Sequence, residues 1–127
     1  MASPWIQFGP QILYWAPRHL KEIWNVDHVL ITENGCSSDD SIAPDGHIYD
    51  TDRVMYLRNY LAQAHRAVAE GWPLRGYFLW SLLDNFEWAD GYTKRFGIYY
   101  VNFETLERKA KLSAEFYRET IARHAVA

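Results

Sequence analysis

The sequence predicts an α/β fold in which parallel strands are joined by a helix. The first observation is the run Val29–Thr32, four strand-forming residues without polar alternation, which is typical of a strand buried on both faces of a parallel sheet. The second is the amphipathic helix pattern that follows it, and the third is another strand pattern directly after that helix. Strand, helix and strand form a βαβ unit, so two parallel neighbouring strands are expected.

Before the first strand, residues 5–10 are aromatic but aperiodic, and we expect them to be irregular. A helix is predicted near Gln11–Trp24, because apolar residues recur there at helical spacing. Pro17 lies inside this segment and is expected to kink the helix or to mark a later start. Residues 25–27 then form a short turn into the strand.

The segment 36–49 is rich in Ser, Asp, Pro and Gly and predicts a polar loop after the first strand. Its acidic residues Asp39, Asp40 and Asp45 are expected to be solvated, because calcium needs more oxygen ligands than this stretch matches. Cys36 at the start of the loop is expected to be partly exposed and chemically inert, since no neighbouring base can be identified.

The clearest helix in the sequence spans about Asp52–Glu70. Its apolar stripe consists of Val54, Leu57, Leu61, Ala64 and Val68. Asp52 or Thr51 is expected to cap the start, and Gly71 with Pro73 is expected to end it.

Four segments complete the chain. A second strand is predicted at Gly76–Trp80, followed by a long aromatic and acidic loop over residues 81–94. The stretch Arg95–Phe103 is expected to be extended, and apolar residues at helical spacing predict a last helix near Lys109–Arg123.

The bulk properties exclude several classes of protein. The 127 residues suffice for one domain, about half of a typical ~250-residue β/α barrel. A net charge of −3 argues against a nucleic-acid-binding protein, because such proteins usually carry an excess of positive charge. The sequence has no membrane-spanning stretch and no signal-peptide pattern, so a cytoplasmic protein is expected. The single cysteine and the irregular histidine spacing predict neither a disulfide nor a metal site, and no cofactor is expected.

Two strand ends carry residues that suit a sugar ligand. Glu33 ends the first strand before the turn Asn34–Gly35, and Trp80 begins the stretch that contains Glu87 and Trp88. The carboxyl ends of parallel strands meet at one rim, where ligands bind. Indole offers a flat apolar surface to the C–H face of a pyranose, and carboxylates accept strong hydrogen bonds from its hydroxyls.

The same residues have a plainer interpretation. Trp80 and Trp88 would then fill a core, while Asp84, Glu87 and Asp90 would belong to a solvated loop. Composition alone does not separate the two interpretations, because short motif matches are weak evidence.

Three longer stretches are more specific: ITENG at Ile31–Gly35, FLWSLLDNFEWADGYTKRFGIYYVNF at Phe78–Phe103 and RKAKLSAEFYRETI at Arg108–Ile121. With them the chain resembles the C-terminal part of the β-glucosidases of glycoside hydrolase family 1. The resemblance implies an α/β fold that is the C-terminal part, about the last two βα units, of a (β/α)8 TIM barrel. Residues 1–127 would form a single partial-barrel domain.

The resemblance also implies roles for five residues. Glu33 matches the catalytic nucleophile, and Trp80 matches the platform under the non-reducing sugar. Glu87 matches the residue that binds the distal hydroxyls of that sugar, with Trp88 beside it, and Phe96 matches an apolar wall of the pocket. Family members that act on phosphorylated sugars have other residues at the Glu87 and Phe96 positions, so an uncharged sugar or β-glycoside is the expected ligand.

One family feature is absent from these residues. The acid/base glutamate of the family lies in an Asn-Glu-Pro motif, which does not occur here. Strands without the neighbours of a whole barrel would expose edges and apolar patches, which drive association, so a homo-oligomer is expected. A partner chain could then supply Asp84, Asp90 or Glu104 as a substitute acid.

Three functions therefore stay open. The first is the nucleophile-bearing part of a retaining β-glucosidase, which hydrolyses O-glycosyl bonds and releases terminal β-D-glucose or a similar sugar in carbohydrate metabolism. The second is a catalytically incompetent barrel fragment that binds sugar weakly or self-associates. The third is an unrelated α/β domain with a solvated acidic loop, which the length of the match argues against.

Overall fold

The computed structural model of the chain describes residues 3–126. In chain order its elements are α1 (Ile12–Trp24), β1 (Val29–Asn34), α2 (Thr51–Ala69), β2 (Leu74–Leu79), the short 3-10 helix η1 (Trp88–Asp90), β3 (Tyr99–Val101), β4 (Arg108–Ala110) and α3 (Leu112–Arg123). None of the described helices is long and apolar enough to cross a membrane.

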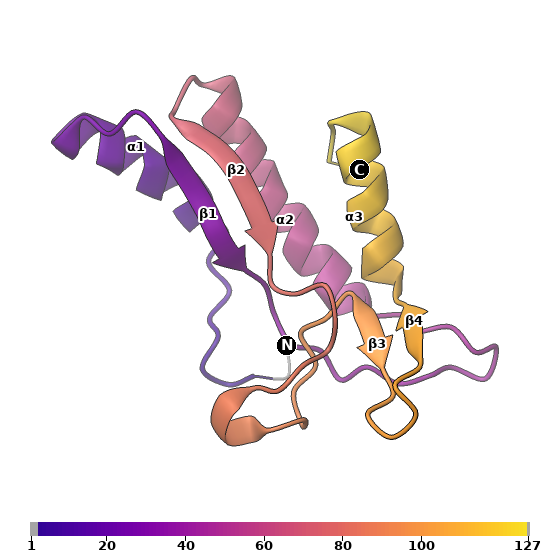
Figure 1. The fold of residues 1–127 in the computed structure, drawn as a ribbon. Helices are drawn as coiled ribbons and strands as arrows, with labels where there is room; N and C mark the ends of the chain where they lie inside the picture. Colours follow the sequence, from indigo (N-terminus) through magenta and orange to yellow (C-terminus); the bar gives the residue numbers. More distant parts are fainter. Residues whose placement is uncertain (1–2, 127) are drawn as a thin grey trace.

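The centre of the fold is a βαβ unit. β1 and β2 pair in parallel, with Leu30 opposite Gly76 and Ile31 opposite Tyr77, and α2 is the crossover between them (Figure 1). The predicted parallel pair is confirmed. β1 extends two residues beyond the predicted end at Thr32, whereas β2 begins before Gly76 and ends at Leu79, one residue before the predicted end. Because the strands are parallel, their carboxyl ends lie at the same rim of the sheet.

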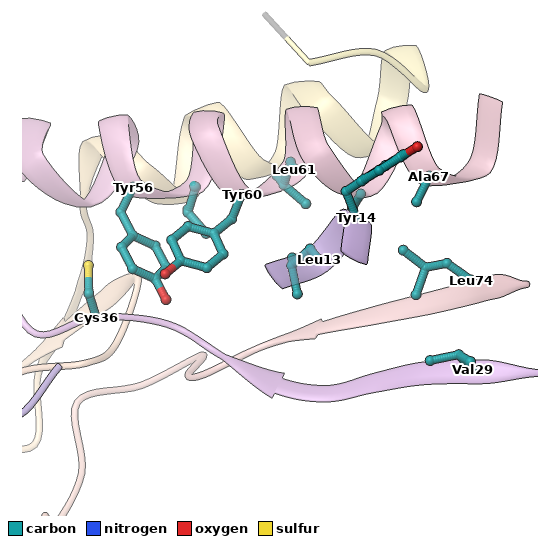
Figure 2. Close-up of a cluster of buried hydrophobic side chains, with 11 residues drawn as sticks. Leu13, Tyr14, Val29, Cys36, Tyr56, Tyr60, Leu61, Ala67 and Leu74 are labelled. Atoms are coloured by element: carbon teal, nitrogen blue, oxygen red, sulfur yellow. The ribbon is translucent and has the colours of Figure 1, made fainter. Parts of the chain in front are cut away.

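The core lies between the helices and one face of this sheet (Figure 2). It is built from Leu13, Tyr14, Val29, Cys36, Tyr56, Leu57, Tyr60, Leu61, Ala64, Ala67 and Leu74. On the other face Leu30 and Phe78 are 56% and 58% exposed. The expectation that Val29–Thr32 is buried on both faces is therefore wrong, because the described helices cover only one face.

The C-terminal elements differ from the prediction. Only Tyr99–Val101 of the expected extended stretch forms a strand, β3, and it pairs antiparallel with β4. Lys109 lies opposite Tyr100 in this pair. The pairing holds Arg108–Ala110 extended, and α3 begins only at Leu112 instead of near residue 109.

The start of α2 also differs from the prediction. The N-cap residue is Asp50, not Asp52 or Thr51, and its side chain makes no capping bond to its own helix. Asp50 instead accepts a hydrogen bond of 2.9 Å from the backbone N–H of Ser113, in the first turn of α3. One of the unpaired N–H groups at the start of α3 is thereby satisfied from the start of α2.

Cys36 is wholly buried, so the expectation of partial exposure is wrong. Burial raises the pKa of its thiol to about 12. A thiol with this pKa is protonated at neutral pH, which agrees with the expected inertness because the thiolate is the reactive form.

A set of ion-paired side chains, here called the buried charge network, joins the loops that follow β1 and β2. It consists of Asp40, Asp50, Arg53, Asp84, Arg95 and Lys111. All of these side chains except that of Arg95 are fully removed from solvent. The three positive and three negative charges balance, which is the condition under which buried charges are tolerated.

Arg53 joins the two halves of the network. It forms ion pairs with Asp40, 3.1 Å away, and with Asp50, and it donates hydrogen bonds to the carbonyl oxygens of Cys36 and Arg95. Burial opposes the charge on Arg53, but its partners, Asp40 foremost, raise its pKa on balance. Asp40 was expected to be solvated, and that expectation is wrong because it is a buried partner of Arg53.

Lys111 completes the network from the start of α3. Its Nζ lies 2.5 Å from Asp40 and 2.7 Å from Asp84, and it donates to the carbonyl oxygen of Gly97. Asp84 in turn accepts hydrogen bonds from the backbone N–H groups of Gly97 and Val101. Asp84 therefore does not belong to a solvated loop. It links the loop after β2 to the loop after β1 through Lys111.

The network makes a prediction for Lys111→Met. Burial lowers the pKa of Lys111, yet its loss would leave the network with three buried carboxylates and only two positive charges. We expect a loss of about 3–5 kcal/mol in the free energy of unfolding, measured by urea denaturation. The control is Lys109→Met, which removes a single hydrogen bond to the carbonyl oxygen of Gly46 and should cost no more than about 1.5 kcal/mol. Equal effects of the two substitutions would contradict the prediction.

Candidate active site

A cavity of about 390 Å³ opens at the carboxyl ends of β1 and β2. It is lined by Trp5, Ile6, Gln7, Ile12, Glu33, Asn34, Gly35, Tyr56, Tyr60, Trp80, Glu87, Trp88 and Phe96. The structure thus brings Glu33, Trp80, Glu87, Trp88 and Phe96 to one cavity, although up to 63 residues separate them along the chain (96 − 33). The volume lies in the range of sites for small ligands.

Glu33 is the penultimate residue of β1 and is exposed to solvent. Among residues 3–126, no hydrogen bond or ion pair holds its carboxylate. The residue after it is held firmly: the Asn34 amide donates to the Tyr56 hydroxyl, 2.9 Å away, and accepts from the Tyr77 hydroxyl at the same distance. Burial raises the pKa of both tyrosines, so both hydroxyls remain protonated at neutral pH. Glu33 is thus free to meet a ligand while its backbone is fixed.

The two strand ends are in direct backbone contact. The N–H of Trp80 donates to the carbonyl oxygen of Asn34 over 2.9 Å. A Cβ atom placed on Gly35 would lie 1.8 Å from the carbonyl oxygen of Trp80, so only glycine permits this approach. The separation of Glu33 and Trp80 is therefore set by the backbone, not by side-chain packing.

The loop after β2 carries the remaining aromatic and acidic side chains. A backbone hydrogen bond from Ser81 to Phe96 joins the two ends of this loop, and one from Glu87 to Gly91 closes the turn that contains η1. Phe96 is only 6% exposed and forms a buried wall, whereas Trp88 is 83% exposed. Trp80 is also well exposed, so the interpretation of these tryptophans as core residues is wrong.

Sequence reasoning missed the contribution of residues 5–7 and of Tyr56 and Tyr60. Trp5 is half exposed and presents a further indole to the cavity. The aperiodic stretch around it carries no pattern that would place it, since its position depends on contacts with α2. The two tyrosines stand among the apolar positions of a helix, where the pattern predicts only core packing.

Two other cavities are larger, but their linings contain fewer carboxylates and no tryptophan. A cavity of about 450 Å³ between α2, β2 and α3 is lined mainly by apolar residues and contains no carboxylate. A groove of about 490 Å³ along α3 contains a single carboxylate, Glu115, and no tryptophan. No group of three or more potential metal ligands exists among residues 3–126. The cavity at the strand ends is therefore the candidate site.

The chain is similar to proteins of one known family. The model of glycosyl hydrolase family 1 matches residues 1–126. β-Glucosidase A of Thermotoga maritima is 48% identical over 112 residues, which cover 88% of this chain and 25% of that protein. β-Glucosidase A of Acetivibrio thermocellus is 51% identical over 117 residues, which cover 92% of this chain and 26% of that protein.

A solved structure of the Thermotoga maritima β-glucosidase in complex with deoxynojirimycin matches with a TM-score of 0.91 at 45% identity, over 95% of this chain and 28% of that one. The chain thus spans about a quarter of the length of the relatives it matches. The predicted fold class, part of a (β/α)8 barrel, is confirmed.

The contact between the strand ends makes a prediction for Gly35→Ala. The added methyl group meets the backbone of Trp80, which cannot move aside like a flexible side chain. We expect a loss of about 1–3 kcal/mol in the free energy of unfolding and a shifted tryptophan emission maximum. Gly9→Ala is the matched control, because a Cβ atom there meets nothing within 4 Å. A Gly35→Ala protein as stable as the control would contradict the proposed backbone contact.

Proposed function

The chain belongs to glycosyl hydrolase family 1, and from this premise we propose that it carries the nucleophile and the sugar platform of a retaining β-glucosidase. The observation that carries the proposal is the cavity shared by Glu33, Trp80 and Glu87. The expected substrate is a small β-glycoside with a terminal β-D-glucose or a similar uncharged sugar. The matched relatives are named β-glucosidases, which supports this substrate class.

Each residue has a role in the proposed reaction. Trp80 stacks under the sugar ring, Glu87 accepts hydrogen bonds from the distal hydroxyls, and Phe96 with Trp88 bounds the pocket. Glu33 attacks the anomeric carbon, and the bond to the leaving oxygen breaks with its electron pair. Water then cleaves the covalent glycosyl-enzyme, and two inversions leave the configuration of the sugar retained.

Protonation of the leaving oxygen is the step with the least support among these residues. The described cavity lining contains two carboxylates, Glu33 and Glu87, and both already have roles. Asp84, considered above as an acid supplied by a partner chain, is buried and paired with Arg95 and Lys111, so no substrate can reach it. We therefore propose that substrates whose leaving group departs without a proton react best.

This proposal predicts the activity of the chain. We expect faint or no hydrolysis of nitrophenyl β-glucoside and none of cellobiose, because general-acid help is typically worth ~10²–10⁴-fold and nitrophenolate needs it least. Any activity should disappear in Glu33→Gln. The matched control is Glu107→Gln, an exposed carboxylate outside the cavity lining, which should leave the rate unchanged.

A covalent label tests the nucleophile directly. A 2-deoxy-2-fluoro-glucoside of dinitrophenol should add one fluoroglucosyl group to the intact protein, detected by mass spectrometry and mapped to Glu33. Labelling in Glu33→Gln would disprove the proposed nucleophile. Robust cellobiose hydrolysis that is lost in Glu33→Gln would instead show that a second carboxylate acts as the acid.

Self-association is a second candidate property, and the exposed face of the sheet favours it. Leu30 reaches over Gly76, and Phe78 lies two residues further along the same face of β2. Within residues 3–126, each of these strands pairs on one side only, so each has a free edge. A second copy of this chain offers the same apolar face and edges, which are the features that promote pairing.

Association should be measured by sedimentation at micromolar concentration. We expect a dimer or larger assembly, and we expect the double substitution Leu30→Lys with Phe78→Lys to convert it to a monomer. The control Ile42→Lys changes an equally exposed residue that lies in the loop after β1, and it should leave the assembly intact. A monomeric wild-type chain would rule out this second candidate.

A further inference from the structure

Two tyrosines of α2 contact two parts of the cavity wall at once. Tyr56 and Tyr60 are one helical turn apart and lie on the same face of the helix. Their rings stack with centroids 4.1 Å apart and planes 20° apart, and each side chain is only 3% exposed. Figure 2 shows both rings directed from α2 toward the end of β1. A buried, stacked pair has little freedom to move, so it can serve as a reference point for its neighbours.

Tyr56 holds the strand end that carries Glu33. Its hydroxyl accepts the hydrogen bond from the Asn34 amide, and the carbonyl oxygen of Asn34 accepts the N–H of Trp80. The orientation of Asn34 therefore affects the residue on each side of the site. Removal of the Tyr56 hydroxyl would leave a largely buried amide donor without its partner.

Tyr60 holds the other part of the wall. Its hydroxyl accepts a hydrogen bond of 2.9 Å from the backbone N–H of Gly9 and lies 3.5 Å from the carbonyl oxygen of Gln7. The ring of Phe8 packs edge-on against both tyrosines, with centroid distances of 6.1 Å and 5.8 Å. The irregular segment that carries Trp5 is thus fixed to α2 by the Tyr60 hydroxyl and by two aromatic contacts of Phe8.

We propose that Tyr56 and Tyr60 are positioning residues with separate tasks: Tyr56 orients Glu33 and Trp80 through Asn34, and Tyr60 sets the position of the wall formed by Trp5 and Gln7. The inference rests on the proposed function, in which the carboxylate of Glu33 is the nucleophile. It follows that the two hydroxyls affect different steps. Loss of the first misdirects the nucleophile, while loss of the second weakens the binding of substrate.

The test compares Tyr56→Phe and Tyr60→Phe, which keep the rings and remove only the hydroxyls. The matched control is Tyr14→Phe, since Tyr14 is equally buried and its hydroxyl donates to Glu70 at the far end of α2. All three proteins are labelled with the dinitrophenyl 2-deoxy-2-fluoro-glucoside, and the rate is followed against reagent concentration. Thermal melting of each variant confirms that the fold is retained.

We expect Tyr56→Phe to lower the maximal labelling rate about tenfold and to keep the half-saturating concentration. We expect Tyr60→Phe to raise the half-saturating concentration about tenfold and to keep the maximal rate. A purely structural role would alter both constants together in both variants. That result, or either variant behaving like Tyr14→Phe, would overturn the inference.

A second readout separates this inference from the proposed function. With 5-fluorotryptophan incorporated, fluorine NMR resolves the individual indoles, and Trp5→Phe and Trp80→Phe assign two of the signals. We expect Tyr56→Phe to shift the Trp80 signal and spare that of Trp5, and Tyr60→Phe to do the reverse. If the wild-type chain is not labelled, the proposed function fails and these spectra alone decide the inference. Signals that stay in place, or that move together in both variants, would overturn it.

Discussion

The buried charge network is the constraint on which both loops of the site depend. Arg53 reaches the carbonyl oxygens of Cys36, after β1, and of Arg95, before the cavity wall at Phe96. Lys111 joins the same loops from α3 through Asp40 and Asp84. Removing any one member would strand an opposite charge in the interior, which costs far more than breaking a surface pair. The loops are therefore held by charges whose ionic partners all belong to the same network.

α2 connects this network to the cavity that contains Glu33. Arg53, Tyr56 and Tyr60 follow one another at helical spacing along its buried face, which also carries Leu57 and Leu61. The start of that face carries the charge network, its middle carries the tyrosine pair, and its far end packs into the apolar core. A single helix thus fixes the position of both loops relative to the sheet. Glu33 stays exposed at the rim, while the side chains that hold this rim in place are buried.

Several parts of the site could be predicted from the sequence because they depend on local pattern. Glu33 lies near the end of an apolar strand, and Trp80 directly follows the next strand, so a parallel pair had to bring them to one rim. The reach of the site to Trp5 could not be predicted, because contacts with α2 place that segment. The role of Arg53 was equally hidden, since an arginine at a buried helical position looks like an interruption of the apolar stripe.

By itself the sequence determined the order and type of the main elements, because hydrophobic period and turn residues act locally. It also placed Glu33 and Trp80 at the two strand ends that line the candidate site. Only the tertiary structure decided which charges are buried: Asp39 is exposed, while its neighbour Asp40 lies between Arg53 and Lys111. The tertiary structure also decided that position 35 must be glycine, because a Cβ atom there would collide with the backbone of Trp80. Both depend on groups more than a dozen residues away, and no local pattern encodes such distances.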